Sequence, residues 1–502
     1  MNERIENLHT IVLGAGPAGL ASAYILAKAG LKPVVLDREK VPGGLMRSIH
    51  RDDFVVAVGR KELYNRLAKV DDFWESVIGS DYRQYSHRGG YLYDGHVLEM
   101  SRAYRGFRRG MSWSMFLGCV SGFVLSRMNV FAPPPRNIEE YFYRTRGRLL
   151  TRVASQGFQE KLIGRRWADM PMPNNYTNGD AGFLPTLKAA MSRALTTSEV
   201  NTYKGIWRHP AKGTGQICDA LAKGITDSGG AFGYGAKILE FKVGDTRVES
   251  VVAEVDGQRI CYRPLNVVSS IPLEVAIPML GRKIPAAYAA AAGAPSQRRT
   301  VILVYLFMDR PPKFPHAWLQ VTDQNTRIGR ITNYSGFNSD MVPPGKGALC
   351  CEYYCFGADP LLDKDAATLT RETLDYCVSA GLIDRESVKD DLMLKFPGAD
   401  ASQNRHNWIT GMRLGLTEEI APYRNLYFVG RTDLDIATLA GIESAEAIIS
   451  GNRHTFDLHF DPTQLGIRSE GKAFEFKLPV AADTNAGARK EDVLATPAHS
   501  VR

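Results

Sequence analysis

The chain has 502 residues, of which 44% are hydrophobic and 23% are charged. These fractions are ordinary for a packed globular protein, and they exclude a wholly disordered, collagen-like or disulfide-scaffold chain. Lys and Arg outnumber Asp and Glu by 62 to 54, and the resulting net charge of +8 is compatible with an anionic partner but proves none.

The chain opens with the pattern of a βαβ unit. The apolar strand HTIVLGAG leads through a glycine turn to a predicted helix over residues 17–30 and a second strand, LKPVVLD. Gly14, Gly16 and Gly19 stand where a dinucleotide fold needs glycine, for a tight turn, for close backbone approach to a diphosphate and for helix–strand packing. Asp37 ends the second strand, where a carboxylate can accept hydrogen bonds from ribose hydroxyls. We therefore predict dinucleotide binding, rather than a glycine-rich turn of an ordinary α/β domain.

Residues 60–160 are predicted to be mainly helical, with a break at prolines 133–135. Within them, residues 101–150 hold nine arginines, no lysine and two glutamates. Such a run suits a phosphate-bearing ligand, an anionic membrane surface or a solvated basic face. The segment 112–128, SWSMFLGCVSGFVLSRM, has apolar residues at helical spacing. We favour a helix packed within a substrate domain, its small residues allowing close neighbours, over one in a membrane interface, because an interfacial polar face is usually charged rather than built from Ser and Gly.

The second half predicts more pieces of a nucleotide-binding domain. Residues 206–272 contain a helix, GQICDALAKGITDSGG, and strands AKILEFKV, RVESVVAEV and LNVVSSIP. Residues 298–356 are rich in strand patterns and residues 361–395 are predicted to be helical. PYRNLYFVGRTD followed by ATLAGIESAEAIISG predicts a last strand, a Gly–Arg turn and a closing helix. These pieces lie at both ends and in the middle of the chain, so we predict two interleaved domains.

The seven cysteines lack the spacing of a disulfide framework or of paired metal ligands. We therefore predict a reducing compartment and no metal site. The first ten residues carry mixed charges, and the longest apolar stretch is interrupted and short of about 20 residues. On this basis we expect no secretory signal, no transmembrane segment and a cytoplasmic location.

Two further glycine motifs complete a resemblance to a known family. Gly43-Gly44 follows Asp37 by six residues, and Gly430-Arg431 precedes the closing helix. Together with the first glycine turn they resemble the flavoproteins that group amine oxidases, protoporphyrinogen oxidases, phytoene desaturases and UDP-galactopyranose mutases. The resemblance covers roughly residues 8–452. It implies an α/β fold with a Rossmann-like FAD-binding domain of glutathione-reductase type, interleaved with a mixed-sheet and helical substrate domain. The expected bounds are 1–75, 205–275 and 415–455 for the first domain, 76–204 and 276–414 for the second, and 456–502 for an extension disordered from about 482.

The resemblance also implies noncovalent FAD, because no Cys or His stands in a known attachment position. The residues it assigns to the cofactor are Gly14, Gly16, Pro17, Ala18, Gly19, Asp37, Arg38, Gly43, Gly44, Leu45, Met46, Ile238, Gly430, Arg431, Ala440, Gly441 and Ile442.

Several positions depart from the family pattern. The family's usual Glu is Asp37, Ala57 and Arg60 replace an acid and a glycine, and segments 396–399 and 432–435 lack the expected aromatics. We still expect flavin binding despite these changes, but they leave the substrate chemistry open.

By this resemblance the protein is expected to be a FAD-dependent oxidoreductase that abstracts a hydride from a small-molecule substrate, as oxidases, dehydrogenases and desaturases do. The alternatives are a non-redox flavoenzyme of UDP-galactopyranose mutase type and a flavin-binding protein without catalysis. Arg299 and Arg330 are the candidate catalytic residues and favour an anionic substrate, unless each is a structural ion pair. We expect no nucleic-acid partner, and the pattern leaves peripheral membrane contact open. Weaker candidates for proton transfer are His209, Glu352, Tyr353 and Tyr354.

Overall fold

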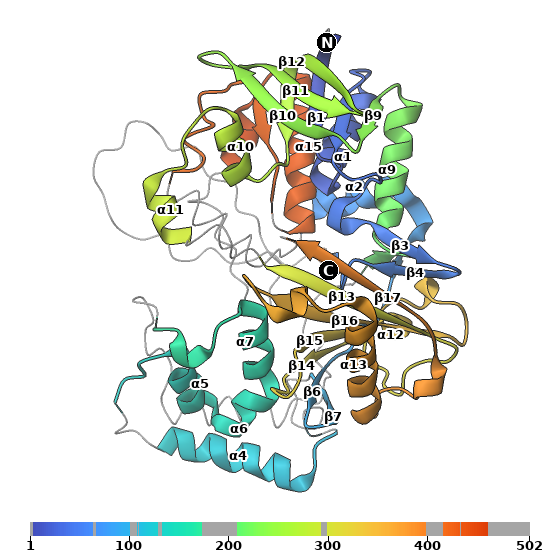
Figure 1. The fold of residues 1–502 in the computed structure, drawn as a ribbon, viewed down its shortest axis with the longest axis vertical. Coiled ribbons are helices and arrows are strands. Elements are labelled where there is room, and N and C mark those ends of the chain that lie inside the picture. Colours follow the sequence, from blue (N-terminus) through green and yellow to red (C-terminus); the bar gives the residue numbers. More distant parts are fainter. Residues whose placement is uncertain are drawn as a thin grey trace, which may run out of the picture.

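The structure is a computed structural model that describes residues 4–63, 67–100, 108, 110–128, 133–172, 208–292, 299–397, 415–431 and 433–459. Within these residues, two seven-stranded sheets and their helices form a mixed α/β fold (Figure 1). In the view of Figure 1 the first sheet lies above the second, and a group of helices lies at the lower left.

The first sheet is parallel at its centre. Its strand order is β10 (Lys237–Val243), β11 (Val248–Val255), β12 (Gln258–Ser269), β1 (Arg4–Leu13), β2 (Val34–Asp37) and β9 (Ala231–Tyr234), and β18 (Leu426–Phe428) also pairs with β12. Strands β18, β12, β1, β2 and β9 pair in parallel, while β10 and β11 are antiparallel to their neighbours. Ile11, Val12 and Leu13 are all buried because both faces of the sheet are covered, so this strand reads as a continuous apolar run.

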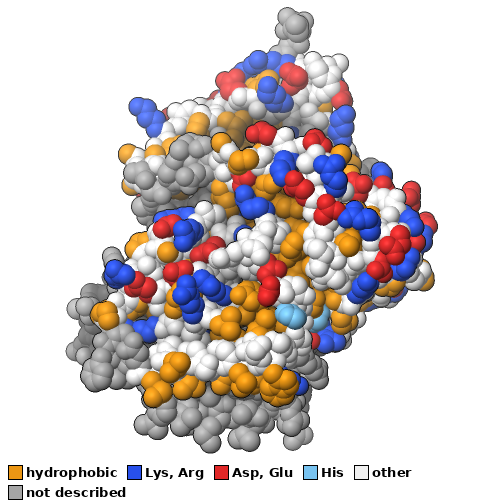
Figure 2. Space-filling model, turned by 60° about the horizontal axis from the view of Figure 1, so that its bottom comes forward, with side chains coloured by type: hydrophobic (Ala, Val, Ile, Leu, Met, Phe, Trp, Pro, Cys, Tyr) orange, Lys and Arg blue, Asp and Glu red, His pale blue; other side chains and the backbone are white. Residues whose placement is uncertain are grey.

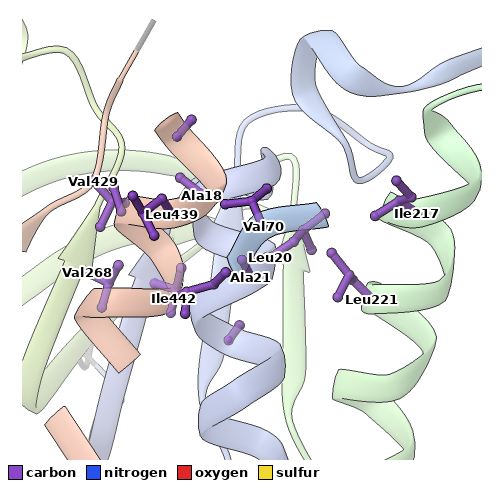
Figure 3. Close-up of a cluster of buried hydrophobic side chains, with 14 of the residues drawn as sticks. Ala18, Leu20, Ala21, Val70, Ile217, Leu221, Val268, Val429, Leu439 and Ile442 are labelled. Atoms are coloured by element: carbon purple, nitrogen blue, oxygen red, sulfur yellow. The ribbon is translucent and has the colours of Figure 1, made fainter. Parts of the chain in front are cut away.

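Four helices cover one face of this sheet: α1 (Pro17–Lys28), α2 (Ala68–Ile78), α9 (Gly215–Asp227) and α15 (Leu434–Ser450). Figure 3 shows Leu439 and Ile442 of α15 beside Val429 and Val268, and Ile217 and Leu221 of α9 facing the side of α1. Helix α15 lies directly on α1. A Cβ atom on Gly441 would lie 2.1 Å from the carbonyl oxygen of Ala18, so only glycine permits this approach.

This contact supports a stability prediction. Gly441→Ala is expected to lower the free energy of unfolding by about 1–3 kcal/mol, because α15 must move off α1. Gly122, in helix α4 (Trp113–Met128), is the matched control, since nothing lies within 4 Å of its Cβ position. Gly122→Ala is expected to be neutral or to stabilise by up to about 1 kcal/mol through helix propensity. Urea unfolding measures both, and equal effects would contradict the packing argument.

The second sheet has the order β17 (Val388–Pro397), β13 (Thr300–Met308), β16 (Gly347–Cys355), β15 (Ile328–Asn333), β14 (Trp318–Val321), β6 (Gly89–Tyr93) and β7 (His96–Glu99). Its residues alternate between two cores. Ile302 and Val304 join the core beneath α13 (Ala366–Ser379), whereas Leu303 and Tyr305 join a core with β4 on the other face. Two small sheets pair β3 (Ser48–Arg51) with β4 (Phe54–Ala57), and β5 (Tyr82–Gln84) with β8 (Arg208–Pro210).

The remaining elements are short. The α-helices are α5 (Ile138–Arg146), α6 (Arg148–Thr151), α7 (Gly157–Ile163), α10 (Leu273–Met279), α11 (Ala286–Ala292), α12 (Tyr334–Phe337) and α16 (His454–His459), with a π-helical turn at Arg152–Gln156. Single 3₁₀ turns occur at Gly44–Met46, Gly79–Asp81, Trp167–Asp169, Ser339–Met341, Pro360–Leu362 and Arg385–Ser387. Among the described helices, none combines the length and the apolar character needed to cross a bilayer.

Three sequence-based predictions need correction. The described part of residues 60–160 is mainly helical, as predicted, but it also includes β5, β6 and β7, which the prediction missed. The β6–β7 hairpin turns at Asp94-Gly95, both at positive φ, a hairpin signal that the prediction missed. Residues 361–395 are helical only in part, since β17 starts at Val388 and alternates exposed and half-buried residues as an edge strand does. Helix α4 packs against α5 and α6, as expected, but the rest of the protein does not enclose it, and among its described residues only Cys119 is buried. The predicted disorder from residue 482 lies outside the described residues.

Candidate functional site

The three glycines of the first turn differ in what surrounds them. Gly14 has φ +108°, and a Cβ there would lie 2.0 Å from Ser270 Oγ. A Cβ on Gly19 would lie 1.9 Å from the carbonyl oxygen of Gly14. By contrast, nothing lies within 4 Å of a Cβ on Gly16. The fold therefore requires glycine at the outer two positions, while the middle one borders free space.

That free space lies at the amino-terminal end of α1. Gly16 is the N-cap residue and offers no side chain to the first turn, which starts at Pro17 and carries no acidic residue. The first N–H groups of a helix, here those near Ala18, have no partner within the helix and carry a partial positive charge. This end of α1 therefore suits an anion such as a diphosphate.

The Gly43-Gly44 pair packs against the first turn. The Gly43 N–H donates to the Ala15 carbonyl oxygen at 2.7 Å, and a Cβ on Gly44 would lie 3.4 Å from Gly16 Cα. After this pair the side chains diverge. Leu45 packs on the core of the second sheet, while Met46 is buried in the core around α1. The segment thus joins the glycine turn to the second sheet.

The Gly430-Arg431 corner meets the first turn at Ser270, just after β12. The Ser270 N–H donates to the Leu13 carbonyl oxygen at 2.9 Å, and the Val429 N–H donates to the Ser269 carbonyl oxygen at 2.8 Å. A Cβ on Gly430 would lie 3.1 Å from the Ser270 carbonyl oxygen. Two turns that are some 400 residues apart in sequence therefore flank one residue, at the carboxyl ends of parallel strands, where ligands bind in open α/β sheets.

Arg431 contributes a desolvated cation to this corner. Its Nη1 donates to the Gly430 carbonyl oxygen at 3.1 Å, and its guanidinium lies 5.1 Å from the centre of the Phe428 ring. Burial lowers the pKa of Arg431 to about 9. A guanidinium in such surroundings favours an anionic or electron-rich ligand.

Other predicted cofactor residues act mainly through backbone or packing. The Asp37 carboxylate accepts from the Ala15 N–H at 2.5 Å and the Glu39 N–H at 2.8 Å, so it braces the turn. Arg38 is exposed and 3.6 Å from Glu39. Ile238 follows Ala236, whose N–H donates to the Asp37 carbonyl oxygen. Ala440, Gly441 and Ile442 are buried in α15, where the side chains of Ala440 and Ile442 belong to the core.

Arg299 and Arg330 lie beside a buried carboxylate of the second sheet. Arg330 donates to Tyr354 Oη at 3.1 Å, and Tyr354 in turn donates to Glu352 Oε2 at 2.9 Å. Arg330 Nε is 3.8 Å from the same Glu352 oxygen. Arg299 donates to the Leu162 carbonyl oxygen at 2.6 Å and lies 4.4 Å from the centre of the Tyr354 ring. The structure therefore brings both predicted arginines together around Tyr354.

The same Glu352 is also bound from the segment that follows β4. The Arg60 N–H donates to Glu352 Oε1 at 3.0 Å, and the Arg60 guanidinium pairs with Glu62 at 2.9 Å. Burial lowers the pKa of Lys61 to about 8 and raises that of Glu62. Burial also acts to raise the pKa of Glu352, but Arg330 and the Arg60 N–H outweigh it and hold that pKa below its ordinary value. We call these residues the Glu352 cluster: Arg60, Lys61, Glu62, Arg299, Arg330, Glu352 and Tyr354.

Of the remaining proton-transfer candidates, His209 adjoins this cluster through a hydrogen bond with the Lys61 backbone, whereas Tyr353 lies apart from it. His209 is fully buried and 2.9 Å from Asn338, and burial lowers its pKa to about 3. Tyr353 hydrogen-bonds Thr373 at 2.7 Å, in the core beneath α13. Sequence reasoning missed Lys61 and Glu62, for which the charged GRKEL following an apolar strand was the available signal.

Residues 17–449 match the family of flavin-containing amine oxidoreductases. The chain belongs to this family. Family membership implies a flavin cofactor and confirms the resemblance expected from the glycine motifs. Three of the positions at which this chain departs from the family pattern, Gly398, Ala399 and Thr432, lie outside the described residues.

Individual relatives are distant. The chain is 25% identical over 279 residues to a lycopene-forming phytoene desaturase of Pseudescherichia vulneris, covering 48% of this chain and about half (52%) of that relative. It is 24% identical over 379 residues to a phytoene dehydrogenase of Streptomyces griseus, covering 67% of this chain and 71% of that one. Among solved structures, a reduced UDP-galactopyranose mutase has a TM-score of 0.68 at 16% identity, with 94% of this chain and all of that one covered. That likeness shows a shared fold.

Proposed function

We propose that this family member is a FAD-dependent oxidoreductase that removes a hydride from a small-molecule substrate. The observation that carries the proposal is the meeting of the Gly14–Gly19 turn and the Gly430-Arg431 corner at Ser270. A single elongated ligand with an anionic middle would contact both turns. FAD is such a ligand, and the two distant relatives named a phytoene desaturase and a phytoene dehydrogenase support a redox role.

The residues present fit noncovalent FAD. The free space at Gly16 and the amino-terminal end of α1 would hold the diphosphate, Asp37 and Ile238 would lie toward the adenosine, and Arg431 would face the flavin ring. In this proposal the first sheet belongs to a Rossmann-like domain of glutathione-reductase type, formed by residues 1–75, 205–275 and 415–455. The second sheet belongs to the substrate domain, formed by residues 76–204 and 276–414.

The flavin supplies the redox chemistry, as acceptor of a hydride from a substrate C–H bond. This chain's residues would bind and orient the substrate. The Glu352 cluster holds four cations, Arg60, Lys61, Arg299 and Arg330, against two carboxylates. Arginines of this kind bind carboxylate or phosphate groups in a fixed, bidentate geometry. We therefore propose an anionic group on the substrate, with Glu352 positioning Arg330 and Arg60.

A sugar-nucleotide mutase is the second candidate. The TM-score of 0.68 to the UDP-galactopyranose mutase favours it, and the same surplus of arginines would suit a diphosphate. The two candidates differ in electron flow, since the mutase reaction produces no net oxidation of its substrate.

Anaerobic mixing separates the two candidates. With the oxidised holoenzyme, a true substrate is expected to bleach the visible flavin band without added reductant, because the substrate itself is the electron donor. Stopped-flow absorbance with a panel of amine, polyene and carboxylate donors measures this. If no donor bleaches the band and only the pre-reduced protein converts a UDP-sugar, the oxidoreductase proposal is wrong and the mutase is right.

A further inference from the structure

Helix α4 presents five of its large hydrophobic side chains to solvent. Trp113, Leu117, Val124, Leu125 and Met128 are each between 45% and 66% exposed, and they are five of the eleven exposed large hydrophobic residues in the described chain. Trp113, Leu117, Val124 and Met128 are four, seven and four positions apart, so they lie along one side of the helix as a stripe, with Leu125 beside it. Figure 2 shows this stripe as a row of hydrophobic side chains along the lower part of the described surface.

The inward side of α4 combines small residues with two larger ones, Met115 and Phe116, which pack on the buried cluster around Cys119. A Cβ on Gly118 would lie 2.9 Å from a side-chain carbon of Leu149 in α6, and Cys119 is buried. At Gly147, a Cβ would lie 2.6 Å from the backbone of Gly122. A surface helix of a globular protein normally turns its apolar side inward and its charges outward. Helix α4 carries large apolar side chains on its outward side as well, which indicates that the exposed stripe has an apolar environment to enter.

The ends of the stripe carry cations. The Arg108 guanidinium lies 4.5 Å from the centre of the Trp113 ring, and Arg127 is the one charged residue within α4. Residues 101–150 as a whole have nine arginines against two glutamates. Tryptophan and arginine beside an apolar face match the boundary between acyl chains and anionic headgroups, where the ring stays at the interface and the cation reaches the headgroups.

We propose that α4 docks this protein on the surface of an anionic lipid bilayer. Its apolar stripe would enter the boundary between headgroups and acyl chains, with the helix axis parallel to the membrane plane. At 16 residues α4 is shorter than a typical membrane span, which fits an interfacial position. Lipid is favoured over a second copy of the chain, because a symmetric dimer through α4 would set two strongly basic regions against each other. This proposal does not depend on the flavin chemistry.

Vesicle co-sedimentation of the full-length protein tests the proposal. We expect binding to vesicles of phosphatidylcholine mixed with phosphatidylglycerol, weaker binding to phosphatidylcholine alone, and weakening by salt. The double variant Leu117→Glu, Leu125→Glu is expected to bind at least about tenfold more weakly, since two exposed apolar anchors are lost. Leu265→Glu in β12 is the matched control, because Leu265 is 58% exposed, as Leu117 is, and lies away from α4. It is expected to bind as the wild type does.

Tryptophan fluorescence tests the same proposal on the wild type if the double variant does not fold. Adding anionic vesicles to the wild type is expected to shift the tryptophan emission to the blue, and Trp113→Phe is expected to remove most of that shift. Absence of vesicle binding by the wild type would overturn the proposal, and so would equal losses in the double variant and Leu265→Glu. A dimer in light scattering that the double variant dissociates, without vesicle binding, would assign the stripe to a second copy instead.

Discussion

Replacing Gly16 by valine is expected to give a folded protein that has lost FAD. The Gly16 backbone has φ −79° and ψ −179°, which valine adopts readily, and nothing lies within 4 Å of the Cβ position. The stability of the apoprotein should therefore change by no more than about 1 kcal/mol, including the loss of a glycine N-cap. The added side chain would occupy the space proposed for the diphosphate. We expect the affinity for FAD to fall by about a hundredfold or more, equivalent to about 2.8 kcal/mol.

Isothermal titration of the apoprotein with FAD measures this affinity, and urea unfolding of the same apoprotein measures the stability. Gly19→Val is the contrasting variant. Its Cβ would lie 1.9 Å from the Gly14 carbonyl oxygen, so it should destabilise the apoprotein itself. If Gly16→Val bound FAD as tightly as the wild type does, the diphosphate could not lie at the place we propose.

Replacing Glu352 by leucine is expected to destabilise the protein by about 3–5 kcal/mol at neutral pH, the range for breaking a buried ion pair. The Arg60 N–H and the Tyr354 hydroxyl would both lose their acceptor, and Arg330 would lose its nearest carboxylate. Because the folded-state pKa of Glu352 is below its ordinary value, the ionised carboxylate stabilises the fold above that ordinary value. This contribution is lost as the pH falls through the lower folded-state pKa.

Urea unfolding at neutral and acidic pH therefore measures two expected features of the Glu352→Leu variant. Its deficit relative to the wild type should be large at neutral pH and should shrink in acid. Glu419→Gln is the surface control, because it breaks an exposed pair with Arg282 at 2.9 Å and should cost at most about 1 kcal/mol. A deficit for Glu352→Leu no larger than that of the control would show that the cluster is not a buried ionic network.

The local motifs were predictable because glycine spacing carries physical constraints that act over short distances. Gly14 and Gly19 are fixed by contacts that a Cβ would break, and these contacts are what the motif encodes. The strand patterns around Ile11, Val34 and Val267 likewise follow from burial on both faces. The contacts of Asp37 were not predicted, because its carboxylate accepts hydrogen bonds from two backbone N–H groups of its own turn region. A role of Asp37 in binding the ribose stays a prediction.

The Glu352 cluster was beyond local sequence reasoning. It joins the segment after β4 to strands β15 and β16, nearly 300 residues away, and no spacing rule links Arg60 to Glu352. The orientation of α4 was mispredicted for a related reason. Its small residues were expected to admit close neighbours, and Gly118 does lie against Leu149 of α6, but the apolar stripe of the helix is exposed rather than buried. Which side of a helix faces inward depends on neighbours that the pattern does not name.

In our proposal the two turns that meet at Ser270 hold one FAD molecule. The most direct test of this proposal is to purify the protein, record the visible spectrum, denature the protein by heat and identify the released compound by mass. We expect a flavin spectrum and FAD in the supernatant, with one FAD per chain. A colourless protein that takes up no added FAD, or one that releases FMN, would contradict the proposal, because FMN has no diphosphate to reach from one turn to the other.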